Sequence, residues 1–159
     1  MSAMSDRGGV PLELRLVMPD DVKTVTRWSQ DERVNRYVGG PSVWTVEFTR
    51  SRVLSAGGGD SFRRWYLASR GGDIVGMGAI MFPDESTELG YWVDPEHWGQ
   101  GIAGQILDGM IAVAREADRG LPLSAQIQPA NGASVRVAER AGFAWFASHD
   151  DFDEYRRES

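Results

Sequence analysis

Three glycines open a long amphipathic segment and have the spacing best suited to bind a ligand. Gly99, Gly101 and Gly104 lie in HWGQGIAGQIL, residues 97–107, and the apolar periodicity that follows predicts a helix over 101–118. The first turn of a helix leaves backbone N–H groups without internal partners and carries partial positive charge. Glycine lets that backbone approach a ligand closely and adopt positive φ. The pattern indicates an anion site, above all for phosphate, although glycines also precede helices that bind nothing.

The same glycines match the spacing G-x-G-x-x-G, so a dinucleotide site is an alternative. That fingerprint needs a parallel strand running directly into the first glycine, and an acidic residue about 20 positions further on at the end of the next strand. Here five residues, including Pro95, separate Val93 from Gly99, and the next strand ends in Gln-Ile-Gln without a carboxylate. A dinucleotide site and the nicotinamide-dependent reductase it would imply are therefore disfavoured. A P-loop is excluded because no lysine follows the glycines.

The elements that would position this turn form one domain over residues 11–159, after a disordered lead-in over 1–10. Alternation and turn residues predict strands over 12–18, 62–69, 74–82, 87–93, 123–127, 143–148 and 153–157. Besides the central segment, helices are predicted over 19–30, 31–38, 45–56 and 131–141, the second stopped by Gly39-Gly40-Pro41. The order β-αα-βββ-α-β-α-ββ predicts an α/β (α+β) fold with a mixed, mostly antiparallel sheet of about six or seven strands and helices on both faces.

Composition excludes several other kinds of site. The sequence has no cysteine and only two histidines, His97 and His149, so disulfides, cysteine nucleophiles and Cys-based zinc sites are excluded, and we expect no metal. A net charge of −6 disfavours nucleic-acid binding; it suits a cationic acceptor such as an amine, or simply solubility. No apolar run reaches the roughly 20 residues of a membrane span, and the first residues lack the apolar stretch of a secretory signal. We therefore expect a cytoplasmic protein that has no membrane partner.

An ordered set of motifs runs through the second half of the chain: ELGYWV at 88–93, Pro95, HWGQGIA at 97–103, Asn131, Ser134 and Gly142-Phe143. This set resembles the GNAT superfamily of acetyl-CoA-dependent N-acetyltransferases, and the resemblance extends over roughly residues 12–157. Within the superfamily it is similar to the branch of ribosomal-protein N-terminal acetyltransferases. The resemblance implies acetyl-CoA as co-substrate and direct attack by a primary amine, from a protein N-terminus or a small molecule. We expect a monomer or homodimer.

The resemblance places the cofactor between strand 87–93 and strand 123–127, which in this fold part from each other, often through a β-bulge. Backbone N–H groups over 99–104 would hold the pyrophosphate of CoA, and residues 91–93 and Asn131 would contact the pantetheine arm. The implied cofactor residues are Tyr91, Trp92, Val93, Gly99, Gln100, Gly101, Ile102, Ala103, Gly104 and Asn131.

Two positions depart from the pattern of the superfamily. Its pyrophosphate motif often begins with Arg or Gln, whereas this chain has Trp98, as the ribosomal-type branch does. Many members also place a tyrosine seven residues after the asparagine to protonate the leaving thiolate, and here that position is Ala138. Ser134 is the substitute donor that the branch implies. The missing tyrosine keeps a second hypothesis open, a non-catalytic module that binds acyl-CoA in a regulatory role.

Glu88 is the candidate catalytic base, because an attacking amine must lose a proton to be nucleophilic. Alternation along strand 87–93 places Glu88, Gly90 and Trp92 on one face. A carboxylate beside Trp92 in a partly apolar cleft would have a raised pKa, as a base near neutrality needs. N–H groups of the same strand would stabilise charge on the thioester oxygen. The alternative is that Glu88 is an ordinary exposed strand residue.

The acceptor site has two sets of candidates. The first set is aromatic and would form either the walls of a substrate pocket or part of the core: Trp28, Tyr37, Trp44 and Trp65. The second set is acidic and would either attract a cationic acceptor or form a solvated turn: Asp150, Asp151 and Asp153.

Overall fold

A single mixed sheet organises the chain. The computed structural model describes residues 11–37, 44–59 and 61–159, and within them seven strands form one sheet in the order β1-β2-β3-β4-β5-β7-β6. All neighbouring strands are antiparallel except β4 and β5. The predicted mixed, mostly antiparallel sheet is therefore confirmed. The expected lead-in over 1–10 and the stop signal at 39–41 lie outside the described residues.

The element boundaries follow the sequence pattern closely. The strands are β1 (Leu12–Leu16), β2 (Arg63–Arg70), β3 (Asp73–Met81), β4 (Thr87–Val93), β5 (Leu123–Ile127), β6 (Ala144–Ser148) and β7 (Asp153–Arg157). The helices are α1 (Val22–Gln30), α2 (Glu32–Asn35), α3 (Val46–Leu54), α4 (Ile102–Ala117) and α5 (Gly132–Arg140). Short turns of other helix types lie at Pro19–Asp21, Ser55–Gly59 and Pro95–His97.

The first strand is shorter than predicted because of a side chain that follows it. Asp21 accepts a hydrogen bond from the backbone N–H of Met18 at 2.8 Å and so starts a turn where the strand was expected to continue. Arg15 holds the same carboxylate through two hydrogen bonds of 2.8 and 2.9 Å. This contact fixes the chain at its entry into α1.

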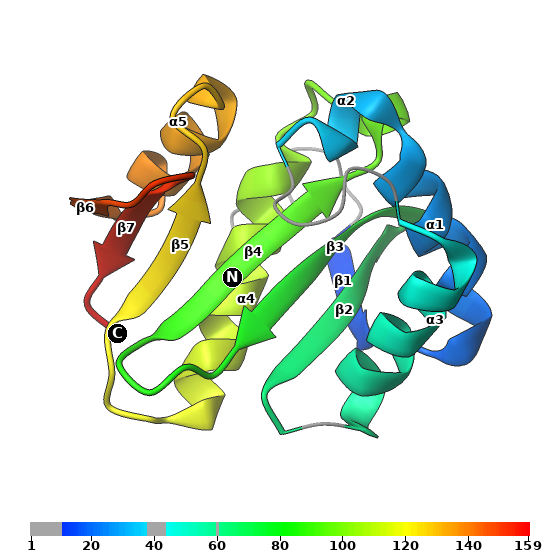
Figure 1. Ribbon diagram of the computed structural model, residues 1–159, viewed down its shortest axis with the longest axis horizontal. Coiled ribbons are helices and arrows are strands. Elements are labelled where there is room, and N and C mark those ends of the chain that lie inside the picture. The colour runs from blue at the N-terminus through cyan, green and yellow to red at the C-terminus, as the bar shows by residue number, and fades with distance from the viewer. Residues whose placement is uncertain (1–10, 38–43, 60) are drawn as a thin grey trace.

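Helices cover both faces of the sheet and enclose two hydrophobic clusters (Figure 1). On one face, α4 and α5 pack through fully buried residues that include Ile106 and Met110. On the other face, α1 and α3 pack through Val25, Trp28 and Val53 against β2 and β3. Burial of apolar side chains on both faces makes the sheet a rigid support for whatever binds at its edges.

The sheet is interrupted in one place, between β4 and β5. These two strands pair only through Thr87 with Leu123 and Glu88 with Ser124, and they diverge from there toward the glycine-rich end of β4 (Figure 1). The ladder between β3 and β4 runs without a register shift, so the strands part without the bulge that is common at this place in the superfamily. Within the described residues, one edge of β4 beyond Glu88 therefore has no neighbouring strand.

Candidate active site

The glycine-rich turn before α4 has the open geometry of an anion site. Gly99 and Gly101 have φ of 80° and 76°, a conformation that glycine adopts without strain, and Gly101 is the N-cap of the 16-residue helix α4. A Cβ placed at Gly99, Gly101 or Gly104 would meet no atom within 4 Å. In contrast, a Cβ at Gly78 of β3 would collide with Met110. Among the described residues, no atom occupies the space that a Cβ at the three glycines of the turn would take, which leaves room for a phosphate to approach the turn.

The other predicted residues of the turn differ in how exposed their side chains are. Ile102 is buried in the core, so it can offer a ligand only its backbone, and Ala103 is half-buried. Gln100 is exposed, and its side-chain oxygen accepts a 2.6 Å hydrogen bond from the Arg70 guanidinium at the end of β2. Sequence reasoning missed Arg70. It lies 30 residues away in the chain, and only the fold brings this cation beside the turn.

The orientation of the peptide groups in β4 shows which of them face the gap. The N–H of Thr87 bonds to Pro122 before β5, and the N–H of Asp94 bonds to Val75 of β3. Since peptide groups alternate sides along a strand, those of Tyr91 and Val93 face the gap and those of Gly90 and Trp92 face β3. Tyr91 and Val93, two of the predicted cofactor residues, therefore present their backbone groups to the gap between β4 and β5.

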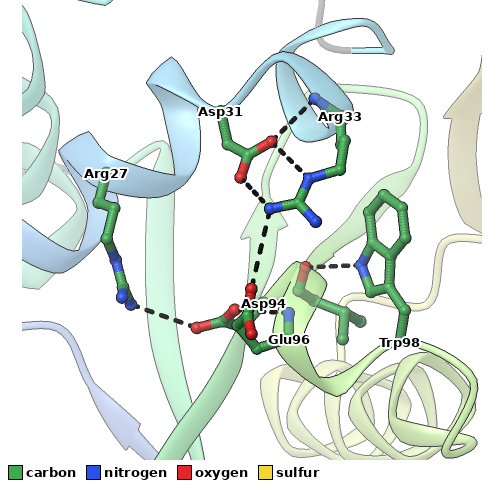
Figure 2. Close-up of polar contacts among 7 residues, drawn as sticks. Arg27, Asp31, Arg33, Asp94, Glu96 and Trp98 are labelled. Atoms are coloured by element: carbon green, nitrogen blue, oxygen red, sulfur yellow. Dashed lines mark hydrogen bonds and ion pairs between the residues drawn. The ribbon is translucent and has the colours of Figure 1, made fainter.

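A polar network secures the segment between β4 and the glycine turn (Figure 2). The indole N–H of Trp98 donates to the Val93 carbonyl at 2.9 Å. Asp94 is buried, accepts from the N–H of Glu96 at 2.9 Å, and forms an ion pair with Arg27 of α1 at 3.2 Å. The superfamily's usual Arg or Gln is thus replaced by a tryptophan that anchors the turn to the end of β4.

Asp94 should contribute acid-sensitive stability. Burial alone would raise the pKa of Asp94, but the hydrogen bond from the backbone of Glu96, together with the Arg27 charge, holds that pKa below its usual range. A depressed folded-state pKa means that the stabilisation is complete above the unfolded value of about 3.9 and is lost as the pH falls through the folded value. We expect Asp94→Asn to lower the free energy of unfolding by about 1–2 kcal/mol at pH 7 and by much less near pH 3.

Urea denaturation at the two pH values measures this difference. Arg27→Gln is the matched control, because the Arg27 side chain is 64% exposed and an exposed ion pair contributes less than about 1 kcal/mol. An Asp94→Asn loss that stays constant down to pH 3 would contradict the assignment.

Glu88 lies where β4 and β5 begin to part. It is half-buried, and its carboxylate accepts a 3.2 Å hydrogen bond from the Gln126 side chain on β5. Burial raises the pKa of Glu88, the nearby Glu154 carboxylate raises it further, and Arg63 opposes the shift. The alternative of a fully exposed strand residue does not describe this environment, and a raised pKa suits a base.

A pocket of about 390 Å³ opens beside Glu88, lined by residues of β4, β5 and β7 among others. On this face of the three strands the described chain has no covering helix (Figure 1). We call this pocket the Glu88 pocket. Within it, Glu154 bonds to His149 at 3.0 Å and to Arg156 at 2.7 Å. Its lining consists of Pro83, Asp84, Glu85, Ser86, Glu88, Ser124, Gln126, His149, Phe152, Glu154 and Arg156.

Ser134 and Asn131 meet at the start of α5. The Asn131 side-chain oxygen accepts from the N–H of Ser134 at 3.2 Å and caps the helix. The Ser134 hydroxyl lies 2.9 Å from the hydroxyl of Tyr91 on β4, so α5 and β4 are linked across the gap. Ala138, in the position where many members have a tyrosine, is 1% exposed and packs in the core.

The candidate acceptor aromatics do not line the Glu88 pocket. Trp28, Trp44 and Trp65 are all buried in the cluster between the sheet and α1 and α3, where Trp44 also contacts Trp92 at 5.3 Å between ring centroids. Tyr37 is half-buried after α2. Of the late carboxylates, Asp150 and Asp151 are exposed and Asp153 accepts from Ser148.

In the described part of the chain, no group of three or more His, Asp or Glu side chains is placed to hold a metal. Nor does any described helix combine the length and apolar character needed to cross a membrane.

Comparison with known proteins agrees with this architecture. A profile of the family described as "Acetyltransferase (GNAT) domain" matches residues 11–144, so the chain belongs to the GNAT acetyltransferase family. It is an acetyltransferase that uses acetyl-CoA. A curated relative, "Uncharacterized N-acetyltransferase YoaA" of Bacillus subtilis (strain 168), is 23% identical over 139 residues, which cover 83% of this chain and 78% of the relative.

Solved structures support the fold. RimL, a ribosomal L7/L12 alpha-N-protein acetyltransferase in complex with coenzyme A, superposes with a TM-score of 0.76 at 23% identity, over 93% of this chain and 94% of that one. AAC(6')-Ib in complex with ribostamycin and coenzyme A superposes with a TM-score of 0.80 at 14% identity, over 93% of each chain. At these identities the likeness establishes a common fold, and the family profile confirms the resemblance to the GNAT superfamily that the motifs indicated.

Proposed function

We propose that this acetyltransferase moves the acetyl group of acetyl-CoA to a primary amine by direct attack, with CoA along the open edge of β4 and the amine in the Glu88 pocket. One arrangement carries the proposal: an open anion turn and a pocket with a poised carboxylate lie at opposite ends of the same unpaired strand edge. From Glu88 to Val93 this edge spans about 17 Å. That length suits an extended pantetheine arm between a bound pyrophosphate and a thioester near the pocket.

Each residue has a defined role in this scheme. The turn over 99–104 binds the pyrophosphate through N–H groups, and Arg70 adds positive charge beside it. The N–H groups of Tyr91 and Val93 continue the sheet onto the pantetheine. The N–H of Leu89, which faces the gap beside Glu88, stabilises the thioester oxygen as charge develops. Asn131 has its side-chain oxygen engaged in the helix cap, so its amide nitrogen is the atom that contacts the arm.

Two side chains act on the reacting atoms. Glu88 accepts a proton from the attacking amine, directly or through water. Ser134 donates a hydrogen bond to the sulfur as the carbon–sulfur bond breaks and the electron pair moves to sulfur. The carbon–nitrogen bond forms at the same carbonyl carbon.

The charge of the pocket favours a cationic acceptor. Asp84, Glu85 and Glu88 contribute carboxylates to its lining, whereas Arg156 is already paired with Glu154. Amines are largely protonated near neutrality, so this field concentrates them near the base. The acceptor is therefore an amine of a small molecule or of a protein N-terminus.

A binding test and a turnover test together examine the proposal. Acetyl-CoA should raise the melting temperature of the full chain and NADH should not. Thiol release should then be followed with a panel of amines that includes a peptide with a free N-terminus, a polyamine and an aminoglycoside. Stabilisation by acetyl-CoA without thiol release for any amine would instead favour the non-catalytic acyl-CoA module. That hypothesis comes from Ala138, which stands where many members have the tyrosine that protonates the thiolate.

Gly90 should control access of the acceptor. It lies between Glu88 and Trp92 on the same face of β4, and a Cβ there would meet nothing within 4 Å. Gly90→Leu should fill this space and raise the KM for the amine at least about tenfold, a loss of about 1.4 kcal/mol of binding. The Kd for CoA should change less than about twofold, because leucine would point away from the cofactor edge.

Steady-state kinetics and calorimetric CoA titration measure the two quantities, and Gly90→Ala serves as the control of smaller volume. Acceptor kinetics that are unchanged by leucine would place the amine elsewhere.

A further inference from the structure

Tyr91 crosses the gap between β4 and α5. Its side chain packs against the cluster beneath α4, and its hydroxyl donates to Ser134 at 2.9 Å. The two residues are 43 positions apart in the chain; Tyr91 lies on β4 and Ser134 on the helix that follows β5, and β4 and β5 are not paired at this level. The hydrogen bond is therefore a specific link across the region proposed for the pantetheine arm.

The direction of this hydrogen bond restricts what Ser134 can do. When Tyr91 donates to the serine oxygen, the hydrogen of the serine hydroxyl must point to another acceptor. The cap from Asn131 fixes the backbone of Ser134 at the same time. The first turn of α5 adds the partial positive charge of a nine-residue helix, which favours an anion there.

Tyr91 keeps its proton over the working range. Burial raises the pKa of the Tyr91 phenol, and the hydrogen bond with Ser134 only partly opposes that shift. The phenol is therefore protonated, and available as a donor, near neutral pH.

We propose that Tyr91 is a positioning residue that orients the Ser134 hydroxyl to donate a hydrogen bond to the departing CoA thiolate. The inference rests on the proposed acetyl transfer and adds to it the device that substitutes for the missing tyrosine at position 138. Ser134 transfers no proton in this step: the thiolate leaves with the electron pair of the carbon–sulfur bond, is held by the hydrogen bond from the serine, and later takes a proton from solvent.

The thiol of bound CoA provides a test that does not depend on turnover. The ultraviolet absorbance of the thiolate, followed against pH in the complex of the full chain with CoA, gives the pKa of that thiol. A hydrogen bond to the thiolate lowers this pKa. In Tyr91→Phe and in Ser134→Ala it should rise by about one unit, equivalent to a tenfold change in ionisation. The double variant should show no further rise, because Tyr91 acts only through Ser134.

Kinetics give a second reading. The kcat of Tyr91→Phe should fall about tenfold with little change in the KM for the amine, and the double variant should match Ser134→Ala. Tyr66→Phe is the matched control, since it removes a half-buried phenol of β2 that packs against the same cluster. Melting temperatures establish that each variant is folded.

The outcomes separate the two proposals. A Tyr91→Phe complex whose thiol titrates like the wild type would overturn the role of Tyr91, whether or not amines are acetylated. Additive effects in the double variant would overturn it too, because Tyr91 would then act independently of Ser134. If the thiol pKa of bound CoA rises in Tyr91→Phe but the folded wild type acetylates no amine, the proposed function is wrong and the positioning role of Tyr91 stands.

Discussion

Gly104→Glu should abolish CoA binding while making the protein more stable. Gly104 lies in the first turn of α4 with helical φ and open space in front of it, so a longer side chain strains nothing. Replacing a helical glycine should add about 0.5–1 kcal/mol, and an acidic residue in the first turn adds about 0.3–1 kcal/mol. The same carboxylate would lie beside the proposed pyrophosphate.

Charge repulsion decides the binding result. Two unit charges 4 Å apart at an effective dielectric of 20 repel by about 4 kcal/mol, so a loss of CoA affinity of at least about 100-fold is expected. Gly104→Gln is the matched control, with the same size and no charge, and it should lose markedly less affinity. Calorimetric titration with CoA and urea denaturation give both quantities. Equal losses for the two variants would show that volume and not charge matters at the turn.

Glu88→Gln should lower kcat by about 10²–10³-fold and leave the Kd for CoA nearly unchanged. The amide has the same shape but cannot accept the amine proton. In the wild type, activity should rise with pH as Glu88 loses its proton, and this acid limb should lie above the ordinary range of a glutamate because its pKa is raised by burial and by Glu154. The limb should vanish in Glu88→Gln.

Glu154→Gln is the control, and the direction in which it shifts the pH profile can be predicted. Removing the neighbouring negative charge lowers the pKa of Glu88, so the acid limb should move to lower pH while activity at high pH remains. Measurement of kcat/KM from pH 5 to 9 for the three proteins tests both statements. A wild-type profile in Glu88→Gln would exclude Glu88 as the base.

The parts of the site that are local in sequence could be predicted from it. Strand β4 is bounded by Pro83-Asp84 before and Asp94-Pro95 after, and the predicted range 87–93 agrees with the structure. The glycine turn could be located because φ preference and helix periodicity act over a few residues. The alternation that groups Glu88 with Gly90 and Trp92 follows from strand geometry alone.

Contacts between distant segments could not be predicted in this way. Arg70 reaches Gln100, and Tyr91 reaches Ser134, only because the sheet order brings their elements together. The tryptophans illustrate the same limit. Trp44 and Trp65 have the same large, mostly apolar side chain, and composition does not distinguish a core indole from one in a pocket. Both are buried in the cluster between the sheet and α1 and α3.

The parting of β4 from β5 should give a signature in the rate at which backbone amides exchange their hydrogens with deuterated solvent. The amides of Gly90 and Trp92 are protected by β3, whereas those of Tyr91 and Val93 face the gap, so slow and fast exchange should alternate along one strand. Saturation with CoA should slow the fast pair selectively. Binding of a ligand that completes the sheet would therefore slow amide exchange at every second residue of β4.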